Sequence, residues 1–207
     1  MTDYEQEQFL ASLAYELPEQ RLHMLSQQGW LQTHSLVQND ETFFSLHAHH
    51  PHMKSFNVHR GTASSKDFET DSQLALDRLH QTERYQQSKE KSLASRLKLG
   101  ASHSIVEVGH SLGGTLADFI AQELNHSSVA FNMGTTPLHD YSKVDRTKHI
   151  HIRKSGDPIS FFDNSTQTIH KDFKASSHWL DHAFTVAHPL LGGVFSTFRR
   201  WYSSHRI

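Results

Sequence analysis

Residues 104–124 read SIVEVGHSLGGTLADFIAQEL, and this stretch decides the fold. Its first part, 104–108 (SIVEV), is a short apolar run that predicts a strand. The segment 109–114 (GHSLGG) contains three glycines and predicts a tight turn. The segment 115–124 (TLADFIAQEL) predicts a helix. The chain therefore passes from strand to helix through a glycine-rich turn that carries Ser111.

Further strands are predicted on both sides of this unit. They are short, and several alternate between apolar and polar residues: 42–49 (TFFSLHAH), 54–59 (KSFNVH), 127–132 (SSVAFN) and 148–153 (KHIHIR). The succession of strand, helix and strand is typical of an α/β sheet with parallel members. We therefore predict an α/β fold with a central, mainly parallel sheet flanked by helices.

Helical segments are expected to complete the chain. Residues 3–16 and 19–27 predict two helices that cover the core. The polar segment 65–99 predicts one or two amphipathic helices, with apolar positions at Leu74, Leu76, Leu79, Leu93 and Leu97. The mostly apolar segment 179–198 also favours a helix. We expect one domain over residues 1–207, with a helical N-terminal cover at 1–40, a core at 42–188 and a basic, aromatic tail at 189–207.

Composition narrows the classes of function. The 207 residues carry a formal net charge of −2, which argues against a dedicated nucleic-acid binder. There is no cysteine and hence no disulfide framework. Neither a signal peptide nor an apolar run long enough to span a membrane is expected, which favours a cytoplasmic or particle-associated protein. The 19 histidines indicate either a solvated, histidine-rich surface or a pH-dependent interaction with a partner or a membrane.

The pattern G-x-S-x-G at 109–113 makes Ser111 a candidate nucleophile, provided that it lies between a strand and a helix. A serine hydroxyl needs a base, and in this architecture an acid and then a histidine follow the serine along the chain. Asp157, after the strand at 148–153, fits the acid. Five histidines lie downstream; His178 is the favoured base and His182 the next candidate. Leu112 supplies one oxyanion amide, and the segment 60–62 (RGT) supplies the other.

These residues together resemble the class 3, fungal-type lipase family of the α/β-hydrolase fold, of which this chain looks like a small, divergent member. The resemblance rests on segments that keep the family order: 60–62 (RGT), 109–114 (GHSLGG), 131–137 (FNMGTTP), 156–159 (GDPI) and 178–181 (HWLD). It implies a Ser111–His178–Asp157 triad, with Thr62 and Leu112 forming the oxyanion hole. It also implies a lipid or small ester as substrate, and neither a cofactor nor a metal ion.

Several features keep other interpretations open. The stretch 66–98 is strongly polar where secreted lipases carry an apolar lid, which disfavours bulk triglyceride. A structural or assembly protein that retains the hydrolase scaffold is the alternative function. Histidines at 47, 49, 50 and 52 are either an exposed loop or a zinc site. The basic, aromatic segment 199–206 is solvated, docks on a protein or contacts a membrane peripherally. The oligomeric state is left open.

Overall fold

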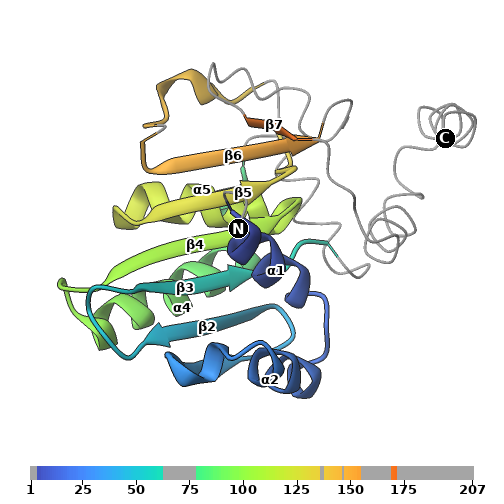
Figure 1. The fold of residues 1–207 in the computed structure, drawn as a ribbon. Helices are drawn as coiled ribbons and strands as arrows, with labels where there is room; N and C mark the ends of the chain where they lie inside the picture. Colours follow the sequence, from blue (N-terminus) through green and yellow to red (C-terminus); the bar gives the residue numbers. More distant parts are fainter. Residues whose placement is uncertain (1–3, 63–77, 136–137, 146, 155–168, 172–207) are drawn as a thin grey trace, which may run out of the picture.

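A single sheet of seven strands organises the molecule (Figure 1). The computed structural model describes residues 4–62, 78–135, 138–145, 147–154 and 169–171. The strands follow one another across the sheet in chain order: β1 (His34–Asn39), β2 (Phe43–Ala48), β3 (Lys54–His59), β4 (Ser104–His110), β5 (Ser127–Phe131), β6 (His149–Lys154) and β7 (Ile169–Lys171). The pairs β1–β2 and β2–β3 are antiparallel, and every pair from β3 to β7 is parallel. The predicted α/β class with a mainly parallel sheet is confirmed.

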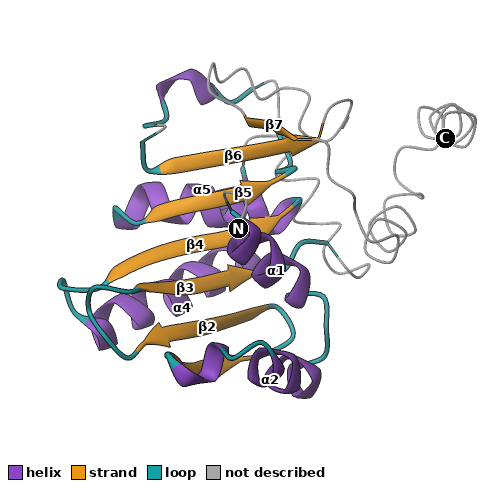
Figure 2. Ribbon diagram, viewed as in Figure 1, coloured by secondary structure: helices purple, strands orange, loops and turns teal. Residues whose placement is uncertain are grey.

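Helices lie on both faces of the sheet, giving three layers (Figure 2). The described helices are α1 (Glu5–Leu13), α2 (Pro18–Gln27), α4 (Glu83–Leu99) and α5 (Leu112–Leu124), with short 3-10 turns at Trp30–Gln32, Leu79–Gln81 and Tyr141–Lys143. Helix α1 contacts β3, β4 and β5 from one side. From the other side, α4 contacts β2 and β3, and α5 contacts β4 and β5.

The segment expected as a helical N-terminal cover, 1–40, also includes a strand at its end. It contains α1 and α2 but closes with β1, an edge strand paired to β2 alone. The sequence of β1, HSLVQN, has apolar residues only at its centre, so its strand signal is weak. Strand β7 was also not expected, and the segment proposed as a helix at 179–198 lies outside the described residues.

The face of the sheet beneath α1 is apolar. Leu10 and Leu13 of α1 pack there, together with Leu25 of α2. The strands contribute alternate residues to the same cluster: Phe44, Leu46, Phe56, Val58, Val106, Val108, Val129, Phe131 and Ile152. Because side chains alternate along a strand, the residues between them must face α4 and α5.

The face beneath α4 and α5 is mostly polar although it is buried; Phe43, Ile105 and Ala130 are its apolar members. The residues that the strands direct there include Ser45, His47, Ser55, Asn57, His59, Glu107, Ser128, His149 and His151. Helix α4 meets them with Tyr85, Ser88, Ser92 and Ser95, while Leu93 and Leu97 of the same helix are exposed. The described part of 65–99 thus contains one of the expected helices, but those two leucines point away from the core. Leu74 and Leu76 lie outside the described residues.

Arg21 of α2 joins the first helices to the β1–β2 turn, and it is almost completely buried. Its guanidinium donates to the carbonyl oxygens of Leu13 (2.9 Å) and Ala14 (3.0 Å) at the end of α1. It also donates to the Asn39 side chain (3.2 Å) and to the Asp40 carbonyl. Burial lowers the pKa of Arg21 to about 10, so the group stays charged at neutral pH. The turn that follows α1 is thereby fixed against the sheet.

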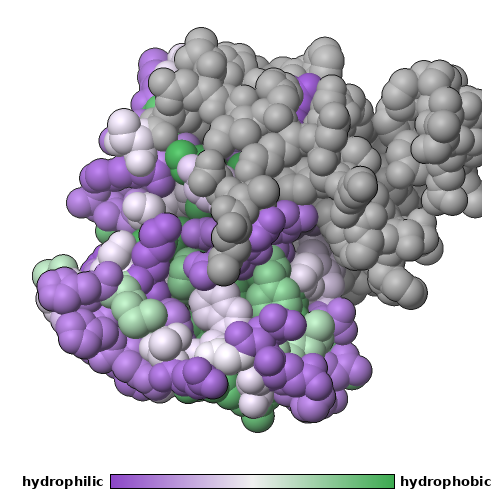
Figure 3. All heavy atoms as spheres, viewed as in Figure 1, coloured by the Kyte–Doolittle hydropathy of each residue, from purple (hydrophilic) through white to green (hydrophobic). Residues whose placement is uncertain are grey.

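The surface on the side of α1 and α2 is mainly hydrophilic, with small hydrophobic areas between (Figure 3). No helix in the described part of the chain combines the length and the apolar character needed to cross a bilayer.

Candidate active site at the carboxyl edge of the sheet

Ser111 occupies the turn between β4 and α5, with φ 55° and ψ −128°. A residue other than glycine in this region of backbone conformation costs about 1–3 kcal/mol and persists only where its surroundings hold it. Here the Ser111 N–H donates to the Phe131 carbonyl (3.0 Å), and the Ser111 carbonyl accepts from the N–H groups of Gly114 (2.9 Å) and Gly134 (3.2 Å). The residue is half-buried. The predicted strand–serine–helix turn is therefore present, and its strain is held by hydrogen bonds.

The glycines of the turn are required by close backbone contacts. A Cβ atom on Gly113 would lie 2.3 Å from the His59 carbonyl oxygen and 2.8 Å from the Gly61 nitrogen. A Cβ atom on Gly109 would lie 2.1 Å from the Gly113 oxygen. Real side chains do not tolerate such distances, because the opposing atoms are backbone. The start of α5 is therefore pressed against both β4 and the end of β3.

The loop after β3 lies beside Ser111. A Cβ atom placed on Gly61 would be 3.4 Å from Ser111 Cβ, and Thr62 follows directly. Arg84 holds this loop from α4, because its Nη2 donates to the Arg60 carbonyl (2.8 Å). Leu112 begins α5, so its N–H is one of the first-turn amides that have no acceptor within the helix. The structure thus brings the loop of Thr62 and the amide of Leu112 to the same place as Ser111.

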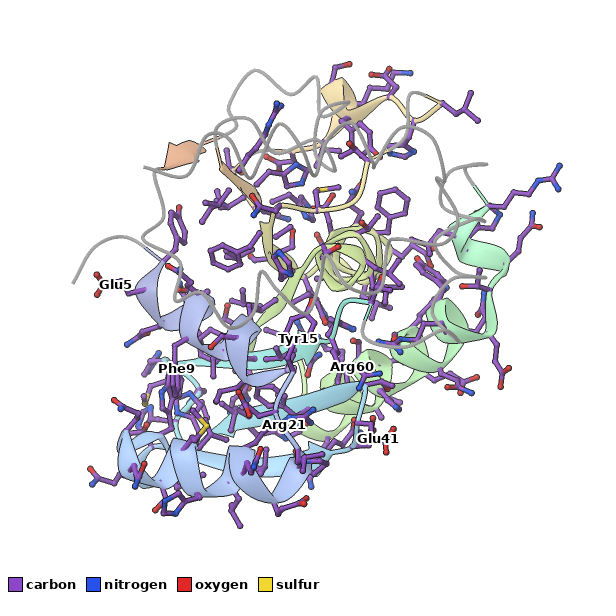
Figure 4. All side chains as sticks on the ribbon, turned by 90° about the vertical axis from the view of Figure 1, so that its right-hand side faces the viewer. Glu5, Phe9, Tyr15, Arg21, Glu41 and Arg60 are labelled. Atoms are coloured by element: carbon purple, nitrogen blue, oxygen red, sulfur yellow. The ribbon has the colours of Figure 1, made fainter. Side chains whose placement is uncertain are left out.

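His110 and Tyr15 add a contact that sequence reasoning missed. His110 is buried, and burial lowers its pKa to about 3, so the ring is neutral. Its Nδ1 lies 3.0 Å from the hydroxyl oxygen of Tyr15, which belongs to the turn after α1. Figure 4 looks onto this edge of the sheet and shows Tyr15 near Arg60, the residue that precedes Gly61. No local signal marks Tyr15, because 95 positions separate it from His110.

A buried carboxylate, Glu107, ties the ends of β3 and β4 together under the site. Its Oε1 accepts from Asn57 Nδ2 (2.9 Å) and His126 Nδ1 (2.7 Å). Its Oε2 accepts from His59 Nε2 (2.7 Å) and Ser92 Oγ (3.0 Å). Burial alone would raise the pKa of Glu107, but the hydrogen bonds from the two histidines outweigh it and lower the pKa to about 2. Glu107 is therefore ionised, and it fixes His59, the last residue of β3.

The proton positions in this network follow from its outer member, Arg96. Arg96 Nε donates to His126 Nε2 (3.0 Å), so His126 accepts there and carries its proton on Nδ1, facing Glu107. His59 Nδ1 is buried and has no hydrogen-bond partner among the described residues. The order of groups is Arg96, His126, Glu107 and His59, running from the surface of α4 to the end of β3.

Asp118 of α5 is the centre of a second buried network. Ser128 Oγ donates to its Oδ1 (2.7 Å), and His149 Nδ1 lies 3.3 Å from the same oxygen. His151 Nε2 lies 3.1 Å from Oδ2. Burial would raise the pKa of Asp118, but the charge of His151 and these hydrogen bonds hold it well below its usual range. This network fixes α5 to β5 and β6.

The remaining predicted site residues are not in the described part. Asp157, His178 and His182 lie outside it, so their roles remain predictions. Of the four histidines considered for zinc, His47 is buried in β2, His49 contacts Ser35 (3.1 Å), and the rings of His50 and His52 lie 5.3 Å apart. Within the described ranges, no group of three histidine or acidic side chains converges in a way that would hold a metal ion.

A groove of about 430 Å³ lies at the opposite edge of the sheet. Phe9, Trp30, His34 and Phe56 are its aromatic lining residues, and Lys54 at the start of β3 also lines it. The amino end of β3 borders it, whereas Ser111 follows the carboxyl end of β4, so the groove is not part of the Ser111 site.

Comparisons of the chain with protein-family models, with curated proteins and with solved structures found no significant match.

Proposed function

We propose that this protein is a serine hydrolase of the α/β-hydrolase fold that cleaves carboxylic esters, with Ser111 as its nucleophile. The observation that carries the proposal is the strained Ser111 backbone, φ 55° and ψ −128°, at the carboxyl end of a parallel strand and the start of a helix. This conformation costs free energy, and it is the one that lifts a serine hydroxyl out of a strand–helix turn. An ordinary helix-capping serine does not need it.

In the proposed mechanism, Ser111 Oγ attacks the ester carbonyl, and the amides of Thr62 and Leu112 stabilise the oxyanion that forms. His178 takes the serine proton and gives it to the leaving alcohol as the ester C–O bond breaks, while Asp157 orients the imidazole and stabilises its charged form. The same histidine then activates a water molecule that attacks the acyl-Ser111 ester, which releases the carboxylic acid and restores the serine hydroxyl. His182 is the alternative base. His110, although adjacent to Ser111, is unsuited to this role because a pKa of about 3 makes it a weak base and Tyr15 occupies its Nδ1.

The substrate that we propose is a lipid ester or another small ester, in keeping with the resemblance to class 3 lipases. The polar stretch 66–98 supports a dispersed ester over bulk triglyceride. Its second half forms α4, which packs on β2 and β3 instead of supplying an apolar lid.

A fluorophosphonate probe tests the nucleophile, followed by mass spectrometry of the modified peptide. We expect stoichiometric labelling at Ser111 and hydrolysis of a short-chain p-nitrophenyl ester, both lost in Ser111→Ala. Ser102→Ala is the matched control, because Ser102 is exposed in the turn before β4, at the other edge of the sheet. Folded protein without Ser111 labelling would contradict the proposal and favour the assembly-protein alternative.

The base is tested by His178→Ala and His182→Ala in the same assay. The variant that abolishes labelling identifies the base, whereas full labelling in both variants would contradict the assignment of either histidine.

A further inference from the structure

The hydroxyl of Tyr15 lies at the backbone of the loop that precedes Thr62. A Cβ atom placed on Gly61 would be 2.3 Å from the Tyr15 hydroxyl oxygen and 3.4 Å from Ser111 Cβ. The hydroxyl is therefore no farther from Ser111 Cβ than the sum of these two distances. Gly61 is buried, so the hydroxyl and the loop are in direct contact where the oxyanion is expected to form.

Tyr15 is held in position by contacts of its side chain and of the adjoining main chain. Its hydroxyl is within hydrogen-bond distance of His110 Nδ1 (3.0 Å), and the two rings meet edge to face with centroids 5.9 Å apart. Its backbone follows Ala14, whose carbonyl accepts from the buried Arg21 (3.0 Å). Tyr15 is thus held at both its side chain and its main chain.

The same contact places Tyr15 between two parts of the site. On one side is His110, the residue before Ser111; on the other is Gly61, the residue before Thr62. A hydroxyl in this position sets how closely the loop of Thr62 approaches the serine. Oxyanion stabilisation depends on donor positions to a fraction of an ångström, so the separation of these two segments controls the rate.

The geometry points to Tyr15 as a positioning residue of the Ser111 site, whose hydroxyl, held by His110, spaces the oxyanion loop from the nucleophile. This inference rests on the proposed function. It adds a residue from the turn between α1 and α2 to a site otherwise formed by the segments that follow the strands.

Kinetics of the full chain with a short p-nitrophenyl ester test this role through Tyr15→Phe, which removes only the hydroxyl. We expect kcat to fall about tenfold or more while KM stays within about twofold, because the oxyanion forms after the substrate binds. His110→Leu removes the same hydrogen bond from its other end and should act alike. The double variant should be slower than wild type by less than the product of the two single effects, because both changes remove the shared hydrogen bond between Tyr15 and His110.

Tyr85→Phe is the matched control. Its hydroxyl donates to Glu123 (2.6 Å) in the last turn of α5, roughly 18 Å along the helix from Ser111. It should lower the melting temperature about as much as Tyr15→Phe and leave kcat unchanged. A kcat of Tyr15→Phe equal to that of Tyr85→Phe, or a loss carried by KM, would overturn the inference alone. A wild-type protein without Ser111-dependent turnover would overturn the proposed function and this inference together.

Discussion

Glu107→Gln keeps the shape of a buried side chain but removes the charge at the centre of four hydrogen bonds. The carboxylate accepts from Asn57, His59, Ser92 and His126, and all four partners are buried. A glutamine has one oxygen and one amide nitrogen, so two of these donors would face a group that also donates. His59 can adapt by moving its proton to Nδ1, but that nitrogen has no hydrogen-bond partner among the described residues.

The size of the effect follows from the pKa of Glu107, which is lowered from 4.5 to about 2. At about 1.4 kcal/mol for each pH unit, the folded protein favours the ionised form by roughly 3 kcal/mol. We therefore expect Glu107→Gln to lower the free energy of unfolding by about 2–3 kcal/mol at pH 7. Because the pKa is depressed on folding, this stability is present above pH 4.5 and is lost as the pH falls toward 2, so the difference between the two proteins should shrink over that range.

Urea unfolding followed by circular dichroism measures this difference. Glu123→Gln is the control, since Glu123 is 41% exposed and pairs with Lys89 at the surface, and it should cost less than about 1 kcal/mol. A loss below about 1 kcal/mol for Glu107→Gln at pH 7 would refute the reasoning, because the carboxylate would then not be ionised and hydrogen-bonded as described.

Four further outcomes are expected. Ser111→Gly should relieve backbone strain and so raise the free energy of unfolding by about 1–2 kcal/mol, which raises the melting temperature, while it abolishes ester hydrolysis. A melting temperature lower than that of Ser111→Ala would speak against the strain. Gly113→Ala should cost about 2 kcal/mol or more in a urea titration and prevent labelling of Ser111, because its Cβ has no room beside His59; full labelling would be inconsistent with that packing. Arg21→Met should cost about 3 kcal/mol or more, since it leaves several buried acceptors without a donor, and an unchanged urea midpoint would contradict this. The folded state should lose stability as the pH falls below 6.5, by up to about 1.4 kcal/mol per pH unit for each of His47 and His110. Burial lowers their pKa values to about 4 and about 3, so the unfolded chain binds protons that the folded chain does not. A melting temperature that stays constant from pH 8 to pH 5 would disprove this expectation.

The parallel part of the sheet was predictable because its signals are local. Residues 104–124 predict a strand, a turn and a helix. The structure has β4 and α5 there, with α5 beginning at Leu112. The strands predicted at 54–59 and 127–132 are also present, as β3 (54–59) and β5 (127–131). The edge strand β1 was missed because it pairs on one side only and its residues are mostly polar.

The polar layer under the sheet could not be predicted from hydrophobic periodicity. The alternating polar residues of β3 suggest a strand with one face in water, yet Asn57 and His59 are buried beneath α4 and bonded to Glu107. Likewise, the buried stripe of α4 includes serines, so its leucines do not mark the buried face. Buried polar residues become visible only once their partners are known.

The candidate site also has residues that the sequence predicts and residues that it does not. Ser111 was predictable because its turn lies within one short segment. Tyr15 was not, because its neighbours Gly61 and His110 come from distant parts of the chain. The acid and the base, Asp157 and His178, stay predictions from chain order.

The two faces of the sheet impose different constraints on inherited variation. On the side of α1, aliphatic and aromatic residues can exchange for one another one at a time if the volume is kept, so drift there should be gradual. In the polar layer on the side of α4 and α5, a single change leaves a buried donor or acceptor without its partner, so Glu107 or Asp118 can be replaced only together with their partners. Homologous chains should therefore vary freely on one face and change in correlated blocks on the other.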